Sequence, residues 1–378
     1  MKRLLLVSHR PIDQAGGPAA RWRSFVRHLP EHGWEVDVVS GGGGDEFASP
    51  ERAHTRARTM EAVGRIADPI FRVAGLRPEA MPISTAWVAR GSARVHRQLR
   101  GQSYDAVLAT GPPFAALMAA RLGAGDVPLI VELRDLWAGN PAFDRGGPVL
   151  RRLESWVVRE SVAVVAVTPE ATVDLRQRHP DARVEEIPNG FEPQLLQMRQ
   201  KTSGTTILHS GTLTKDRPLA PLLRALNPPL RLVLHGYVVP EIMAEIEASS
   251  ADVELVPPSA WEDAVCRIAE ADVTLITQAR GAGDATAVAA KVYEYLALGK
   301  PILSITDGGA TEALLRRLEA DSLVARLDDH RSIEAALDKI RAGDLPPAVS
   351  PEKLAPYERP RLAAQLADLL ASVSDSSG

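Results

Sequence analysis

Residues 271–305 read ADVTLITQARGAGDATAVAAKVYEYLALGKPILSI. An apolar strand ends near Thr277, a loop with Gly281 and Gly283 follows, and a helical pattern of apolar residues runs over 288–298. Gly299 ends this helix and Pro301 opens a second apolar strand. A strand, a helix and a further strand in this order predict a βαβ unit with parallel strands.

The same alternation of short apolar runs and amphipathic stretches extends over nearly the whole chain. In the first half we predict strands at 4–8, 35–40, 106–110, 129–133, 162–168 and 184–187. In the second half we predict strands at 206–209, 230–235, 253–255, 273–277, 301–305 and 323–325. Several of these runs are continuously apolar, which is typical of parallel strands covered on both faces.

Helical patterns lie between the strands and complete two α/β domains. Helices are predicted at 19–29, 114–122, 150–159, 219–226, 240–248, 261–269, 288–298, 311–318 and 361–370. The pattern predicts two Rossmann-like domains, 1–192 and 200–350, facing each other across a cleft. Ligands of open α/β sheets bind at the carboxyl ends of the strands, so that is where we expect the site.

Length and composition narrow the class of protein. The chain has 378 residues, too many for one comfortable core, with 45% hydrophobic and 24% charged residues. Its formal net charge of -4 argues against a nucleic-acid binder. The single cysteine, Cys266, excludes a disulfide framework and a cysteine zinc site, and we expect it to be a small buried residue.

The N-terminal apolar run is better interpreted as a strand than as a signal peptide. It ends at once in Ser8-His9-Arg10-Pro11, and the sequence contains no run of the ~18 apolar residues that a spanning helix needs. We therefore expect a cytoplasmic protein whose contact with a membrane, if any, is peripheral. The sequence leaves the oligomeric state open.

Lys291 and Glu294 are three residues apart and share one face of the predicted helix. A lysine at this place can neutralise a diphosphate, and a carboxylate one turn on can accept both hydroxyls of a ribose. Glycines before the helix allow backbone N–H groups to approach an anion. The alternative is a surface ion pair on an ordinary helix, and spacing alone does not exclude it.

Residues 291–302 resemble the donor-binding segment of retaining GT-B glycosyltransferases of the family-4 type. Other segments resemble that family in the right order along the chain. They are Gly16-Gly17, 32–36, 110–113, 132–137, 187–192 and 209–217. The resemblance covers essentially the whole chain and implies two Rossmann-like domains that bind a nucleotide-diphosphate sugar and an acceptor. It also implies that the final helix, over 358–372, packs back on the first domain.

The resemblance also implies a role for individual residues of the donor site. Glu294 would bind the ribose, while Lys291 and Arg217 would face the diphosphate, with Lys215 as an alternate. The remaining residues implied for the donor are Gly16, Gly17, Gly211 and Asp284, and those implied for catalysis are Arg134, Asp135 and Arg217. Gly211 would let the backbone pass close to the phosphates.

Such enzymes use fixed cations and helix dipoles to stabilise the leaving diphosphate, so the resemblance implies no cofactor and no metal. The sequence contains no Asp-x-Asp motif, which agrees with that expectation. Retaining chemistry of this type is described as departure and attack on the same face of the sugar. It depends on orientation more than on a strong base.

Two positions depart from the family pattern. Many members carry a Glu-x7-Glu pair, and the first position here is Thr286. A threonine binds sugar hydroxyls less strongly than a carboxylate, and Asp284 is close enough in sequence to compensate. Thr212 stands where many relatives carry a basic residue. The first departure leaves the donor sugar and the stereochemistry open.

Further residues have both a functional and a structural interpretation. Arg134 and Asp135 follow a buried strand, where they either contact a ligand or pin a loop. His9 follows the first strand, and a lone loop histidine is more often structural. The arginines at 90, 94, 97 and 100 lie at near-helical spacing and form either a solvated face or a surface for an anionic membrane or phosphorylated acceptor.

The function implied is transfer of a sugar from a nucleotide sugar to a cell-envelope glycan or a secondary metabolite. Three alternatives remain open: a GT-B nucleotide-sugar epimerase, a nicotinamide dehydrogenase and a nucleotide-sugar-binding protein without turnover. An epimerase would need acidic and histidine residues for proton transfer. The dehydrogenase is weakened because no Gly-x-Gly-x-x-Gly motif follows the first strand.

Overall fold

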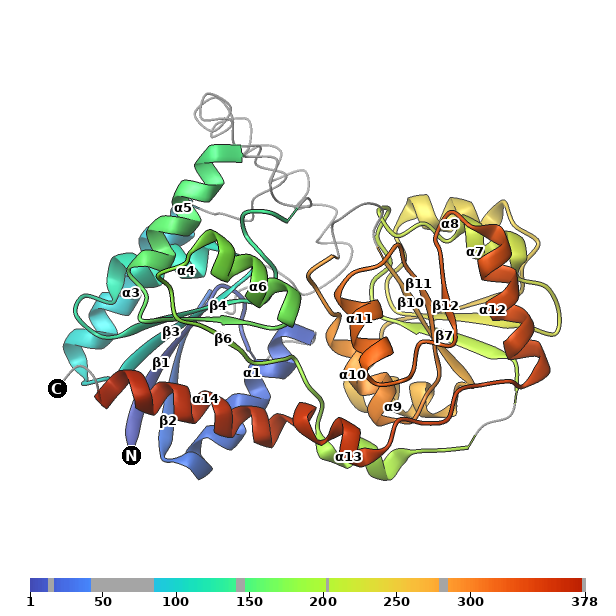
Figure 1. The fold of residues 1–378 in the computed structure, drawn as a ribbon. Coiled ribbons are helices and arrows are strands. Elements are labelled where there is room, and N and C mark those ends of the chain that lie inside the picture. The colour runs from blue at the N-terminus through green and yellow to red at the C-terminus, as the bar shows by residue number, and fades with distance from the viewer. Residues whose placement is uncertain (13–16, 42–84, 141–146, 202–203, 279–284, 376–378) are drawn as a thin grey trace. The chain divides into compact units, whose positions relative to one another are not determined.

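The computed structural model describes residues 1–12, 17–41, 85–140, 147–201, 204–278 and 285–375. The chain divides into two compact units (Figure 1). Unit 1 comprises Met1–Ile187 and Ala363–Gly378, and unit 2 comprises Pro188–Leu362. Each unit contains one six-stranded sheet in which all strands are parallel, so the α/β prediction is confirmed.

Unit 1 has the strand order β2-β1-β3-β4-β5-β6. Its strands are β1 (Lys2–Ser8), β2 (Trp34–Ser40), β3 (Ala106–Gly111), β4 (Leu129–Leu133), β5 (Ala163–Ala166) and β6 (Val184–Glu186). Its helices are α1 (Gly17–His28), α3 (Thr85–Gly101), α4 (Ala115–Gly123), α5 (Gly147–Arg159) and α6 (Pro169–Arg178). The chain order reverses between β1 and β3, so this point is the topological switch of the sheet.

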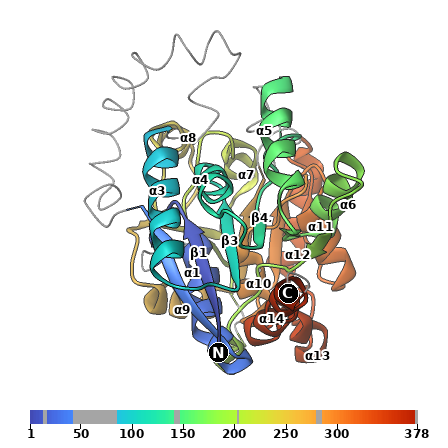
Figure 2. The same ribbon diagram turned by 90° about the vertical axis from the view of Figure 1, so that its left-hand side faces the viewer.

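Helices cover both faces of the unit 1 sheet, with α3, α4 and α5 on one side and α1 on the other (Figures 1 and 2). Strand β1 illustrates why its sequence is continuously apolar. Leu5 and Val7 join the core beneath α3, α4 and α5. Leu4 and Leu6 point to the opposite face of the sheet and are also fully buried.

Unit 2 has the strand order β12-β11-β10-β7-β8-β9. Its strands are β7 (Thr206–Ser210), β8 (Arg231–His235), β9 (Val253–Val256), β10 (Val273–Thr277), β11 (Ile302–Ile305) and β12 (Val324–Ala325). Its helices are α7 (Ala220–Ala225), α8 (Pro240–Glu247), α9 (Trp261–Glu270), α10 (Ala290–Ala297), α11 (Ala310–Arg317), α12 (His330–Ala342) and α13 (Pro351–Leu354). The switch point of this sheet lies between β7 and β10.

The last helix, α14 (Arg359–Ser374), belongs to both units. At its start, the Arg359 N–H donates to the Phe191 carbonyl in unit 2, at 2.9 Å. From Ala363 onward its residues belong to unit 1, where Lys2 Nζ donates to Ser374 Oγ at 2.8 Å. The chain therefore returns to its first unit through this helix, as the fold prediction expected.

Each predicted strand is present, with ends that differ by a few residues. Helices α6 and α12 were not predicted, although their capping residues are visible in the sequence. The Thr168 side chain accepts from Ala171 N at the start of α6, and Asp329 accepts from Arg331 N and Ser332 N at the start of α12. The expectation for Cys266 was wrong, because this residue is exposed on α9.

A buried polar cluster connects α1, β3 and β4 inside unit 1. The Glu132 carboxylate accepts from Arg21 Nε at 2.9 Å, Trp22 Nε1 at 2.8 Å and Thr110 Oγ1 at 2.5 Å. Arg21 also donates to the Ile187 carbonyl, at 2.9 Å. Burial alone would raise the pKa of Glu132, but the Arg21 and Arg134 guanidinium groups hold it below its ordinary value. The carboxylate is therefore ionised and bonded in the core.

Replacing this carboxylate should destabilise the protein much more than replacing an exposed one. We expect Glu132→Gln to lower the free energy of unfolding by about 3–5 kcal/mol, because it leaves the Arg21 charge buried without its partner. Urea unfolding followed by circular dichroism measures the loss. Because the folded pKa is depressed, the stabilisation is present above the unfolded pKa of the carboxyl and is lost as the pH falls through the folded pKa.

Glu185→Gln is the matched control. Glu185 forms an exposed ion pair with Arg183 at 2.9 Å, and such pairs contribute about 1 kcal/mol or less. Equal losses in the two variants would contradict the importance of the buried cluster.

Candidate functional site

The carboxyl ends of β7 and β10 meet at the switch point of the unit 2 sheet. From here β8 and β9 continue to one side of β7, and β11 and β12 to the other side of β10. The loop that follows β7 begins at Gly211, and the chain leaves β10 at Gln278. Crossovers diverge at such a point and leave room for a ligand between the loops. Several of the predicted donor residues lie on these loops and on α10.

Gly211 has the positive φ angle of +122° that favours glycine. A Cβ atom at this residue would lie 3.4 Å from Lys291 Nζ. The Lys291 ammonium donates to the Ser210 carbonyl at 3.1 Å and lies 3.1 Å from His209 Nε2. The structure thus brings together Gly211 and Lys291, both predicted from the sequence, at the end of β7.

His209, on β7, is buried beneath this lysine and was not predicted as a site residue. Its Nδ1 atom lies 3.1 Å from the Leu275 carbonyl oxygen, which can only accept a hydrogen bond. Burial, reinforced by the Lys291 and Arg217 charges, lowers the pKa of His209 well below its ordinary value. The ring is therefore neutral and carries its proton on Nδ1. Two signals were present in the sequence: the histidine follows the apolar residues Ile207 and Leu208, and it begins the segment 209–217 that resembles the family.

Arg217 connects the two loops at the switch point. Its Nη1 atom donates to the Thr277 carbonyl at the end of β10, at 2.5 Å. Its guanidinium therefore lies at the same edge of the sheet as Lys291. Lys215, the alternate cation, is exposed on the same loop. The Tyr295 hydroxyl accepts from Ser210 N at 3.0 Å and so fixes the last residue of β7 to α10.

Glu294, the residue predicted to bind ribose, lies in an ion-pair chain with Arg359 and Glu192. Arg359 Nη2 is 3.7 Å from Glu294 Oε1, and Arg359 Nη1 is 3.7 Å from Glu192 Oε1. Burial raises the pKa of Glu294 above its ordinary value, although the Arg359 charge opposes the shift. Arg359 was not predicted, because it is distant in sequence from the motif that it supports.

Arg134 and Asp135 follow β4 in unit 1, as predicted. The Arg134 N–H donates to the Gly111 carbonyl at 2.9 Å, and its Nη2 atom donates to the Pro112 carbonyl. Its Nε atom lies 3.9 Å from Glu132 Oε2, within the buried cluster. These contacts favour the structural interpretation of Arg134, which holds the loop after β3 against the loop after β4. Asp135 is half-buried beside it.

Other residues named from the sequence are placed as follows. His9 packs against Trp87, with ring centroids 4.9 Å apart, which is the structural role favoured for it. Gly17 is the first residue of α1. The predicted residues Gly16 and Asp284, and the loop glycines Gly281 and Gly283, lie outside the described residues. Among the described residues, no group of three or more His, Cys, Asp or Glu could hold a metal ion.

Comparison with known families identifies the N-terminal half of the chain. Residues 16–190 match the family model described as "Glycosyl transferase 4-like domain". The chain is therefore similar to that family over this segment. The matched residues include Arg134, Asp135 and the buried cluster around Glu132. No curated protein matches the chain in sequence.

Solved structures show the fold of the complete chain. AviGT4, a glycosyltransferase involved in avilamycin A biosynthesis, has a TM-score of 0.59 at 16% identity, covering 100% of this chain and 99% of that one. Anabaena Alr3699/HepE, in complex with UDP and glucose, has a TM-score of 0.55 at 15% identity, covering 100% and 98%. UDP-N-acetylglucosamine 2-epimerase from Rickettsia bellii has a TM-score of 0.60 at 14% identity, covering 100% and 98%. The chain has the GT-B fold that these proteins share.

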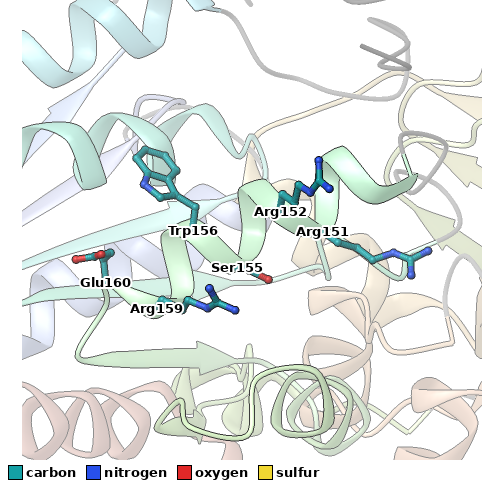
Figure 3. A pocket seen from close by; sticks show the side chains of 6 residues that line it. All are labelled: Arg151, Arg152, Ser155, Trp156, Arg159 and Glu160. Atoms are coloured by element: carbon teal, nitrogen blue, oxygen red, sulfur yellow. The ribbon is translucent and has the colours of Figure 1, made fainter.

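Unit 1 also carries a basic pocket on α5 (Figure 3). The pocket has a volume of about 370 Å³ and is lined by Arg151, Arg152, Ser155, Trp156, Arg159 and Glu160. Arg121 of α4 lies over the Trp156 ring at 5.4 Å and pairs with Glu160 at 3.0 Å. None of the predicted donor or catalytic residues lines this pocket, so it is separate from the candidate site.

Helix α3 carries the arginine stripe noted in the sequence, and its members at 90, 94, 97 and 100 are exposed. Arg94 donates to the Ser40 carbonyl at 2.9 Å, which gives one member a structural contact. No helix in the described part of the chain is long and apolar enough to span a membrane.

The raised pKa of Glu294 predicts that its ionised carboxylate reduces stability. A carboxyl whose folded pKa exceeds its unfolded pKa stabilises the fold when protonated, and this contribution is lost as the pH rises. We therefore expect Glu294→Gln to raise the thermal midpoint at about pH 8 and to lose that advantage at about pH 4. Thermal unfolding across this range measures the difference.

Glu334→Gln provides the control, because Glu334 is half-exposed on α12 and pairs with His330 at the surface. Its midpoint should follow that of the wild type at neutral and alkaline pH. A Glu294→Gln midpoint below that of the wild type at about pH 8 would contradict the assigned direction of the pKa shift.

Proposed function

We propose that this protein is a glycosyltransferase that binds a nucleotide-diphosphate sugar in unit 2 and an acceptor in its glycosyl transferase 4-like domain. The observation that carries the proposal is the pair of cations at the switch point of unit 2. Lys291 and Arg217 are both anchored to strand-end carbonyls, beside the backbone of Gly211. Fixed cations next to exposed backbone are suited to a diphosphate.

The proposed reaction breaks the bond between the anomeric carbon and the diphosphate oxygen. Negative charge then develops on the leaving diphosphate, and Lys291 and Arg217 stabilise it as it forms. The acceptor oxygen bonds to the anomeric carbon, and its proton passes to the leaving diphosphate. Because the charges are held in place before reaction, the protein needs positioning more than a strong base, and no metal ion is part of the proposal.

Glu294 is proposed to accept hydrogen bonds from the ribose hydroxyls of the donor. Its carboxylate lies one helical turn beyond Lys291 on α10 and is oriented by Arg359. An ionised carboxylate accepts two hydroxyl groups more strongly than a neutral group does. The Arg359 charge opposes the rise in the pKa of Glu294 and so favours the carboxylate form.

Uridine diphosphate is the first nucleotide to test. HepE was solved with UDP and glucose, and several structures with the same fold are enzymes of UDP-GlcNAc. The donor sugar depends on the segment before α10, where Thr286 replaces the carboxylate of the family pattern. We propose retention of configuration on the resemblance of residues 291–302 to retaining enzymes.

The second candidate function is epimerisation of a nucleotide sugar without an acceptor. It is supported by the R. bellii 2-epimerase, which shares the fold over nearly the whole chain. Epimerisation requires groups that move protons, and His209 is poorly suited because both of its ring nitrogens are engaged in hydrogen bonds. The hydrogen bonding of His209 therefore favours transfer over epimerisation.

Nucleotide binding is tested first, by calorimetry and thermal shift with UDP, GDP, TDP and ADP. A nucleotide at about a hundredfold over its dissociation constant should stabilise the wild type by ~2.7 kcal/mol. Lys291→Ala and Glu294→Ala should each weaken binding at least about tenfold, a loss of about 1.4 kcal/mol. Lys353→Ala, at a half-exposed lysine paired with Glu319 in unit 2, is the control and should bind like the wild type.

If no diphosphate binds the wild type, the proposed donor site is wrong. If both site variants bind like the control, the nucleotide lies elsewhere in the protein. If the wild type binds one of the four diphosphates and the site variants do not, that diphosphate identifies the nucleotide base of the donor.

Turnover distinguishes the two candidate enzymes. Incubation with a UDP-hexose or a UDP-N-acetylhexosamine, with and without a mixture of sugar and polyphenol acceptors, is followed by NMR. We expect UDP release that increases with acceptor and is lost in Lys291→Ala. Conversion of the donor to its C2 epimer in the absence of acceptor would instead establish epimerisation.

A further inference from the structure

We propose that His209 is a positioning residue that holds the Lys291 ammonium at the phosphate side of Gly211. The role of Lys291 toward a diphosphate rests on the proposed function, whereas the contact between the two side chains rests on the structure alone. His209 lies inside β7, beneath the bound phosphate in this proposal, and it acts through the lysine.

The direction of the hydrogen bonds follows from their partners. The Leu275 carbonyl can only accept, so His209 Nδ1 must donate to it across 3.1 Å. An ammonium group can only donate, so His209 Nε2 must accept from Lys291 Nζ across 3.1 Å. The two contacts require opposite properties of the ring nitrogens, and one neutral tautomer satisfies both. The Leu275 carbonyl of β10 therefore fixes the orientation of the imidazole, and the imidazole in turn fixes the position of the lysine ammonium.

The Ser210 carbonyl supplies the second fixed acceptor for the same ammonium, at 3.1 Å. Two acceptors on adjacent residues of one strand restrict where a flexible four-carbon side chain can place its charge. Gly211 has no Cβ, and a Cβ there would lie 3.4 Å from Lys291 Nζ. The lysine charge is thus held beside the backbone that is proposed to approach the diphosphate.

A neutral acceptor has an advantage over the carboxylate that usually orients a buried lysine. A carboxylate would form a salt bridge and cancel much of the positive charge that a diphosphate needs. The imidazole positions the ammonium and leaves its charge intact. Burial and the nearby Lys291 and Arg217 charges keep the ring in this neutral form.

A double-mutant cycle tests whether His209 acts through Lys291. UDP affinity is measured by calorimetry for the wild type, His209→Leu, Lys291→Ala and the double variant, with GDP, TDP or ADP used instead if the screen selects it. We expect His209→Leu to weaken binding about tenfold in the wild type and less than about twofold in the Lys291→Ala background. Equal losses in both backgrounds would overturn the proposal, because they would indicate a packing role.

His209→Gln is the matched variant, since its side-chain carbonyl can replace Nε2 as an acceptor for the lysine. We expect the UDP affinity of His209→Gln to lie within about threefold of the wild type, whereas that of His209→Leu stays about tenfold weaker. Thermal midpoints of both variants identify losses that come from unfolding. A His209→Gln affinity as low as that of His209→Leu, in folded protein, would contradict the acceptor role.

The tautomer is tested without any nucleotide, so its outcome is independent of the proposed function. Nitrogen-15 NMR of the free wild-type protein should show a proton on Nδ1 and an unprotonated Nε2 for His209, assigned by loss of its signals in His209→Gln. The ring should not titrate between about pH 8 and about pH 5.5, where an ordinary histidine takes up a proton. A proton on Nε2, or titration in this range, would overturn the proposal even if UDP binds.

Discussion

Both sheets are parallel and their central strands are buried on both faces, and this constraint governs where polar chemistry can lie. A charged or strongly polar side chain buried in such a strand is stable only when it is hydrogen-bonded, because leaving it unpaired in the core costs free energy. Glu132 and His209 meet this condition, each with every bond direction dictated by its partners. The remaining functional groups lie at the carboxyl ends of the strands, where the loops begin.

The two buried polar groups have different effects on their surroundings. Glu132 is ionised and connects α1, β3 and β4 by hydrogen bonds, so it contributes to the stability of unit 1. His209 is neutral and connects β10 to a lysine at the edge of the unit 2 sheet. Where only stability is needed, as at Glu132, a buried charge is paired with an opposite charge such as that of Arg21. A neutral group is preferable where a neighbouring charge must remain available to a ligand.

The strands were predictable because apolar periodicity is a local signal. The sequence around Lys291 is also a local signal, and the donor site assigned to it stays a prediction. Lys291 and Gly211 lie close together, although they are far apart in sequence, because β7 and β10 are neighbours in the sheet. The partners of the motif could not be predicted in the same way. Arg359 reaches Glu294 only because α14 starts beside Phe191, and His209 gains its role only when Leu275 lies opposite it. Such contacts depend on strand pairing and chain return, which one sequence without its fold does not specify.

The exposed position of Cys266 corrects a sequence expectation and gives the protein a useful property. It is the only cysteine in the chain, and it lies on the solvent face of α9 in unit 2. Thiol-reactive chemistry will therefore modify the native protein at one known position. A fluorophore or spin label can be attached there without removing any other residue, which makes the unaltered chain its own single-site reporter.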